Sequence, residues 1–141
     1  MPKSRVFVTG LGIISPLGLN VSATWNSAKA GKSGVSTITS FDPSDFETKI
    51  AGEIKDFDPL EYLDKKEARR TDRFVQLAVG ATNQALIQAS LDLSTLVAAE
   101  TSVVIGSGIG GIQTLSQQYA VLSEKGPSRV SPFLIPMMLA D

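Results

Sequence analysis

The chain has 141 residues, of which 43% are hydrophobic and 19% are charged, and its formal net charge is −1. This balance excludes a disordered polyelectrolyte and gives no overall attraction to nucleic acid or to an anionic membrane. The length suits one ordinary domain. No apolar run is long enough to span a bilayer and the N-terminus lacks the features of a signal peptide, so we expect a cytoplasmic protein.

The first elements expected along the chain are a buried strand and a helix. Residues 5–14 (RVFVTGLGII) are β-branched and apolar near their start, which is typical of a strand covered on both faces. Asn20 is placed to cap a helix over residues 21–30, and Gly31 to end it. We expect Trp25 to anchor the apolar face of this helix in the core.

A long central helix dominates the middle of the chain. Before it, a short strand is expected within residues 49–54, and Pro59 opens a helical turn. Thr71 or Asp72 then caps a helix that reaches about Ala89. Its apolar residues surround most of its circumference, which predicts packing on more than one side, and its alanines allow a neighbour to approach closely.

The last third begins with a second buried strand, residues 101–105 (TSVVI), followed by a glycine-rich turn at 106–111. A helix is expected over residues 112–123, an extended stretch over 130–133, and a last helical stretch from Pro136. The order strand–helix–helix–strand–helix indicates the α/β class.

The absence of cysteine and histidine limits the chemistry that this chain can perform. It removes the commonest nucleophile–base pairs, the soft metal ligands and any disulfide. The serines have no imidazole to activate them, and the carboxylates in the loops are not paired at a meaningful spacing. We therefore expect no bound metal, no cofactor and no complete catalytic set.

The turn GSGIGG (106–111) satisfies the G-x-G-x-x-G pattern, and Glu124 lies at roughly the distance of a ribose-binding acid. A dinucleotide-binding α/β module is therefore an alternative. Against it, Glu124 follows a helix instead of a second strand, and the motif comes late in the chain. The glycines also suit a sharp, tightly packed turn, or a pocket or interface. The glycines of Thr9-Gly10-Leu11-Gly12 lack a dehydrogenase spacing and are interpreted as close-packing positions in a strand.

One dense basic cluster interrupts the otherwise even distribution of charge. It consists of Lys65, Lys66, Arg69, Arg70 and Arg73, with Asp64, Glu67 and Asp72 interleaved. In a helix, four of these cations would project from one side, where arginine forks bind phosphate or an acidic partner helix. The alternative is a solvated turn with local ion pairs. Nucleic acid is disfavoured because no aromatic platform accompanies the cluster.

Six segments, in order, resemble the N-terminal part of the β-ketoacyl-[acyl-carrier-protein] synthases of the type II, elongating kind. They are VFVTGLGIISPLG (6–18), AGKSG (30–34), TKIAGEIKDFDP (48–59), KEARRTDRFVQLAVGATNQAL (66–86), VVIGSGIGGIQTL (103–115) and GPSRVSPFLIPMML (126–139). The resemblance covers the whole chain. It implies a thiolase-like fold of two α/β halves in five layers, with residues 1–141 as an incomplete N-terminal half, and a homodimer.

The resemblance also implies a function and site residues. The family condenses an acyl thioester with malonyl held on acyl carrier protein, so the implied partners are acyl carrier protein and fatty acyl and malonyl thioesters. By resemblance, the carrier-docking residues are Lys66, Arg69, Arg70 and Arg129. The residues matching the acyl pocket are Gly108, Ile109, Phe133 and Leu134. On sequence alone, the segment SPFLIPMM (131–138) suits the core best, with a subunit interface and a pocket wall as alternatives.

The family's nucleophilic cysteine and its two histidines lie beyond the matched segments, and the chemistry needs them. We therefore expect the isolated chain to be truncated, poorly stable and inactive alone. The ketosynthase domain of a polyketide synthase, which shares the fold, and a stand-alone carrier-docking piece are further alternatives.

Overall fold

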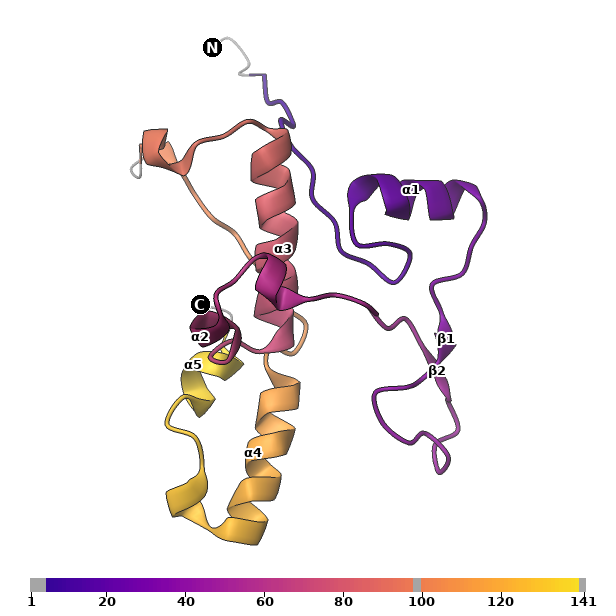
Figure 1. Ribbon diagram of the computed structural model, residues 1–141, viewed down its shortest axis with the longest axis vertical. Coiled ribbons are helices and arrows are strands. Elements are labelled where there is room, and N and C mark those ends of the chain that lie inside the picture. The colour runs from indigo at the N-terminus through magenta and orange to yellow at the C-terminus, as the bar shows by residue number, and fades with distance from the viewer. Residues whose placement is uncertain (1–4, 98–99, 140–141) are drawn as a thin grey trace. The chain divides into compact units, whose positions relative to one another are not determined.

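The computed structural model describes residues 5–97 and 100–139, and these form two compact units (Figure 1). The first unit takes residues up to 58 together with residues 81–91, and the second takes residues 59–80 and those from 92 onward. The division passes through the long helix α3 (Arg73–Gln88), which contributes a part to each unit.

The first unit contains helix α1 (Val21–Lys29) and the antiparallel strands β1 (Ser36–Thr37) and β2 (Ile50–Ala51). The side chain of Asn20 accepts a hydrogen bond from the amide of Ala23 at 2.8 Å, which confirms the predicted N-cap. Gly31, with φ of 65°, follows the helix in the left-handed region, as a glycine after a helix end often does. The short strand expected within 49–54 is confirmed by β2.

The strand expected over residues 5–14 is not formed. Instead, two amides of this extended segment donate to side-chain oxygens of α3: Leu11 to Gln88 at 2.5 Å, and Ile13 to Gln84 at 3.4 Å. Val6 is 92% exposed. A strand needs a neighbouring strand to pair with, and β1–β2 is the one sheet in the described part of the chain.

The glycines of this segment do pack closely, as predicted. A Cβ atom on Gly12 would clash with the carbonyl oxygen of Ala81, and one on Gly10 would clash with the carbonyl oxygen of Ala85. The backbone of the segment therefore lies directly on α3, where the small alanine side chains leave room for it.

The second unit is helical. Its elements are η1 (Pro59–Glu61), α2 (Lys65–Ala68), residues 73–80 of α3, η2 (Leu93–Thr95), α4 (Ile112–Lys125), η4 (Pro127–Arg129) and α5 (Leu134–Met138). α4 packs against both η4 and α5. The strand expected over 101–105 is wrong for the same reason as the first: it has no pairing partner, and Val104 is 91% exposed.

Little of the apolar surface is enclosed. Among the described residues, Phe57 is the one large hydrophobic side chain classed as buried, at 8% exposed. The prediction that Trp25 anchors a core is wrong, since its side chain is 63% exposed. Trp25 lines an open apolar hollow of about 220 Å³ with Val21, Ala28 and residues 11–13. The predicted apolar face of α1 thus exists, but the described residues do not close over it.

Candidate functional site

The basic cluster begins at a strongly capped short helix, α2. The carboxylate of Asp64 accepts hydrogen bonds from the amides of Lys66 at 2.7 Å and Glu67 at 2.8 Å, and the Glu67 carboxylate accepts the Asp64 amide at 3.4 Å. This is a capping box. Two of the interleaved acids therefore bind backbone amides, which leaves the neighbouring cations facing solvent.

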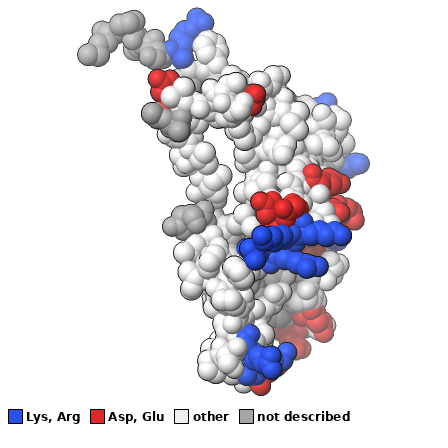
Figure 2. Space-filling model, turned by 60° about the vertical axis from the view of Figure 1, so that its left-hand side comes forward, with Lys and Arg blue, Asp and Glu red and all other residues white. Residues whose placement is uncertain are grey.

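The structure divides the basic cluster between a short helix and a turn, so it combines the two alternatives left open by the sequence. α2 ends at Ala68, so Arg69 is its C-cap and Arg70 lies in the turn before α3, which Arg73 begins. Lys66, Arg69 and Arg70 are nevertheless all exposed. Figure 2 shows Lys and Arg side chains gathered directly beside Asp and Glu side chains. The surface therefore presents charges of both signs, with exposed cations beside exposed carboxylates.

A hollow of about 410 Å³ lies within this cluster. Leu63 gives it an apolar lining residue, and Lys66 and Arg70 contribute cationic ones. The other lining residues are Asp64, Glu67 and Thr71. One apolar residue, two cations, two carboxylates and one hydroxyl therefore line this hollow, so its charge is mixed.

Arg70 joins the basic cluster to the segment predicted as a pocket wall. Its guanidinium carbon lies 4.6 Å from the centroid of the Phe133 ring. Phe133 is the N-cap residue of α5, and α2 and α5 lie beside each other in Figure 1. The structure therefore brings together one residue from each of the two sets predicted from sequence.

The glycine-rich turn is attached to the other end of α5. The amide of Gly111 donates to the carbonyl oxygen of Met138 at 3.0 Å, and a Cβ atom on Gly111 would lie 2.7 Å from the carbonyl oxygen of Met137. Gly110, with φ of 72°, makes the turn. Gly108 and Ile109, both exposed, are thus held near the helix that carries Leu134, which is half-buried.

Arg129, in η4, is exposed and lies in the stretch that joins α4 to α5. Just beyond it, the amide of Ser131 donates to the side-chain oxygen of Gln118 on α4 at 2.7 Å. This hydrogen bond holds the backbone between η4 and Phe133 against α4. That Arg129 belongs to the same surface as Lys66, Arg69 and Arg70 stays a prediction.

The N-terminus of α4 already holds a carboxylate, which sequence analysis did not anticipate. One oxygen of Asp72, a residue only 6% exposed, accepts the amide of Thr114 at 2.9 Å. The amide of Gly110 donates to the hydroxyl of Ser107 at 2.9 Å. A dinucleotide's phosphates would need amides of this kind. Because they are occupied by the chain's own groups, the geometry disfavours the dinucleotide alternative.

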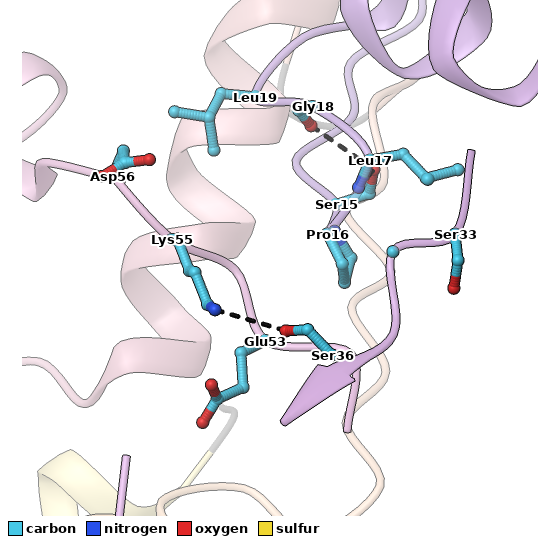
Figure 3. A pocket seen from close by; sticks show the side chains of 11 residues that line it. Ser15, Pro16, Leu17, Gly18, Leu19, Ser33, Ser36, Glu53, Lys55 and Asp56 are labelled. Carbon is cyan, nitrogen blue, oxygen red and sulfur yellow. Dashed lines mark hydrogen bonds between the residues drawn. The ribbon is translucent and has the colours of Figure 1, made fainter. Parts of the chain in front are cut away.

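A second polar hollow, of about 340 Å³, lies in the first unit and was missed from sequence (Figure 3). The ammonium of Lys55 donates to the hydroxyl of Ser36 at 3.3 Å. Glu53 accepts the amides of Thr39 and Ser40, both at 2.9 Å. Hydrogen bonds from Ser40 and Thr39 lower the pKa of Glu53 to about 2. Asp56, which also lines this hollow, has a φ of 61°, in the left-handed region.

The part of the chain that the structure describes contains neither a metal-binding cluster nor a membrane-spanning helix. Within residues 5–97 and 100–139, no three acidic, histidine or cysteine side chains gather closely enough to hold a metal ion. No helix in the same ranges has the length and apolar character needed to cross a membrane.

Comparison with solved structures defines the class of protein. The ishigamide ketosynthase/chain length factor superposes with a TM-score of 0.83 at 28% identity, over 94% of this chain and 33% of that one. A type II polyketide ketosynthase, solved in complex with its acyl-carrier protein, superposes with a TM-score of 0.75 at 22% identity, over 97% and 35%. The fold is therefore that of the thiolase-like ketosynthases, as expected from sequence.

The family follows from the sequence itself. The family model described as β-ketoacyl synthase, N-terminal domain, matches residues 3–140, and the chain belongs to this family. The 3-oxoacyl-[acyl-carrier-protein] synthase 2 of Synechocystis sp. is 48% identical over 141 residues, which is the whole of this chain and 34% of that protein. The chain thus spans about a third of the length of its curated relative.

Proposed function

We propose that the chain is part of a 3-oxoacyl-[acyl-carrier-protein] synthase, which elongates fatty acyl chains by decarboxylative condensation with malonyl-acyl carrier protein. The observation that carries this proposal is the exposed trio Lys66, Arg69 and Arg70, whose acidic neighbours Asp64 and Glu67 bind backbone amides. The 48% identity to a synthase named for that carrier supports the same function.

The parts of the chain have distinct roles in this proposal. The acidic carrier protein docks at Lys66, Arg69, Arg70 and Arg129. Part of the wall of the acyl pocket is formed by Gly108, Ile109, Phe133 and Leu134. A second copy of the protein completes this wall in a homodimer. The exposure of Phe133 and Ile109 in the single chain is consistent with a wall that needs further protein to cover it.

The chain supplies binding groups without the reacting ones. Condensation needs a thiolate to take the acyl group and donors to hold the developing enolate charge. The 141 residues contain no cysteine and no histidine. We therefore propose that this chain alone docks the carrier but forms no elongated product. Elongation that survives rigorous removal of contaminating synthase would contradict this.

The ketosynthase of a polyketide synthase is the second candidate. It is favoured by the type II polyketide ketosynthase among the structural matches. That match is at 22% identity and bears on the fold alone, whereas the relative at 48% identity is named 3-oxoacyl-[acyl-carrier-protein] synthase 2. We therefore place the fatty acyl substrate first.

Titration of the 141-residue chain with acyl carrier protein tests the proposed docking. We expect binding that weakens as salt rises, and at least about ten-fold weaker binding by the double variant Arg69→Glu plus Arg70→Glu. A matched control reverses two cations elsewhere, Lys29→Glu plus Lys32→Glu, with the same change in net charge. Equal losses in both double variants would show that net charge, and not this surface, attracts the carrier.

A further inference from the structure

We propose that Phe133 is a positioning residue for Arg70, so that carrier docking and the predicted pocket wall are energetically coupled. This inference rests on the proposed function, because it takes the acidic carrier protein as the partner of Arg70. The Phe133 ring orients the Arg70 guanidinium before the carrier binds. This role is separate from the predicted docking contacts of Arg70 and from the predicted pocket contacts of Phe133.

The backbones of Arg70 and Phe133 are held by hydrogen bonds, whereas their side chains are exposed. The amide of Arg70 donates to the carbonyl oxygen of Glu67 at 2.9 Å, which holds its backbone at the end of α2. The amide of Phe133 donates to the hydroxyl of Ser131 at 3.1 Å, at the start of α5. Yet the Arg70 side chain is exposed and Phe133 is 40% exposed. A partner can therefore reach the Arg70 guanidinium while the two backbones stay in place.

The stack and a carboxylate use different parts of the guanidinium. Arg70 lies over the ring with its guanidinium carbon 4.6 Å from the centroid, within the range of a cation–π contact. A carboxylate binds in the plane of the guanidinium, through its N–H fork. A partner that approaches the edge therefore need not displace the ring, and the ring restricts the rotamers that a long arginine would otherwise lose on binding.

Coupling of this kind is reciprocal. If the ring strengthens carrier binding by some factor, the bound carrier stabilises the ring's position by the same factor. Phe133 directly precedes Leu134, the first residue of α5, whose far end holds the glycine-rich turn through Gly111 and Met138. Carrier arrival at Arg70 is thereby transmitted to the segments predicted to line the acyl pocket.

Arg70 belongs to the basic cluster and lies over the Phe133 ring, so substitutions at these two positions probe the stack directly. A double-mutant cycle on the 141-residue chain, with acyl carrier protein as the probe, therefore isolates this stack. Phe133→Leu is expected to weaken carrier binding about two- to five-fold. Phe133→Tyr keeps the ring and is expected to restore the affinity. Phe46→Leu, an exposed phenylalanine in the other unit, is the matched control and should change nothing.

Two further readouts separate positioning from general loosening of the fold. In the background of Arg70→Gln, Phe133→Leu should have no further effect on affinity, because there is no guanidinium left to orient. Phe133→Leu should also leave the salt dependence of binding unchanged, since it removes no charge, whereas Arg70→Gln should reduce it.

The outcomes distinguish this inference from the proposed function. No carrier binding by the unchanged chain, under conditions where its NMR spectrum shows it to be folded, would overturn both. Normal binding by Phe133→Leu, or an equal loss in Phe133→Tyr, would overturn the positioning role and leave the docking surface intact. A loss of two-fold or more in Phe133→Leu that disappears in the Arg70→Gln background would support it.

Discussion

The carboxylate of Asp72 accepts a hydrogen bond from the backbone amide of Thr114 at 2.9 Å, across 42 positions of sequence. The two residues are among the few buried polar ones described. Asp72 precedes α3, and Thr114 lies in the first turn of α4. One side chain therefore ties two helices of the second unit together and satisfies an amide that a helix leaves unpaired at its start.

Replacing Asp72 with alanine should release the start of α4. Loss of a capping bond of this kind costs about 1–2 kcal/mol, so the Thr114 amide should exchange with solvent about 5–30 times faster. Hydrogen exchange followed by NMR measures this directly. Asp42→Ala, which removes an exposed bond to the amide of Ser44 in the first unit, is the control and should leave Thr114 protected. Unchanged exchange at Thr114 in Asp72→Ala would show that the bond contributes nothing.

Gly12→Ala should separate the extended N-terminal segment from α3. The new methyl group would meet the carbonyl oxygen of Ala81, which is backbone and cannot move aside without moving the helix. Overpacking of this kind costs about 1–3 kcal/mol. The amides of Leu11 and Ile13, which bond to α3, should therefore lose protection from exchange. Gly106→Ala, where nothing lies within 4 Å of the new methyl, should be tolerated.

The loop held by Glu53 should open in acid. The pKa of Glu53 falls from 4.5 to about 2 because Ser40 and Thr39 hydrogen-bond to its ionised form. A folded pKa below the unfolded one means that this stabilisation is complete above about pH 4.5 and is lost as the pH falls towards 2. NMR titration of the Thr39 and Ser40 amides should show one transition near pH 2.

Glu53→Gln should make those two amides insensitive to pH over that range and shift them at neutral pH. Glu47→Gln, in the same loop, is the matched control. A transition of the Thr39 and Ser40 amides centred near pH 4.5 in the unchanged chain would contradict the assignment.

The isolated chain should melt broadly. Phe57 is the one large apolar side chain classed as buried among the described residues, whereas Val6, Val8, Val103 and Val104 are almost fully exposed. Burial of such side chains is the main source of cooperative stability, at about 1.5–3 kcal/mol each. Calorimetry of the dilute monomer should therefore show a weak, gradual transition. A sharp two-state transition would refute this expectation.

Local signals in the sequence predicted α1, η1, α3 and α4, but they missed α2 and placed the start of α5 at Pro136 instead of Leu134. Asn20 caps α1, Pro59 opens η1, and α3 occupies almost the whole range that its apolar pattern indicated. These features depend on neighbours in sequence, so the residues themselves carry the information. The close packing of Gly10 and Gly12 was also predictable, because only a backbone without a side chain can lie so near a helix.

The strands and the core contacts were not predictable in this way. Residues 5–14 and 101–105 have the composition of buried strands, but a strand also requires a partner at a defined register, which composition does not provide. The same limit applies to Trp25, whose burial depends on what covers its face of α1. The bond from Asp72 to Thr114 and the stack of Arg70 on Phe133 join residues far apart in sequence, and no local pattern indicated either.

The central claim is that this chain binds through its basic surface at Lys66, Arg69 and Arg70 and not through its glycine-rich turn. Parallel calorimetric titrations of the 141-residue chain, one with acyl carrier protein and one with NADH at the same concentrations, test it most directly. We expect saturable heat with the carrier that diminishes as salt is added, and none with NADH. Saturation by NADH together with no response to the carrier would contradict the claim.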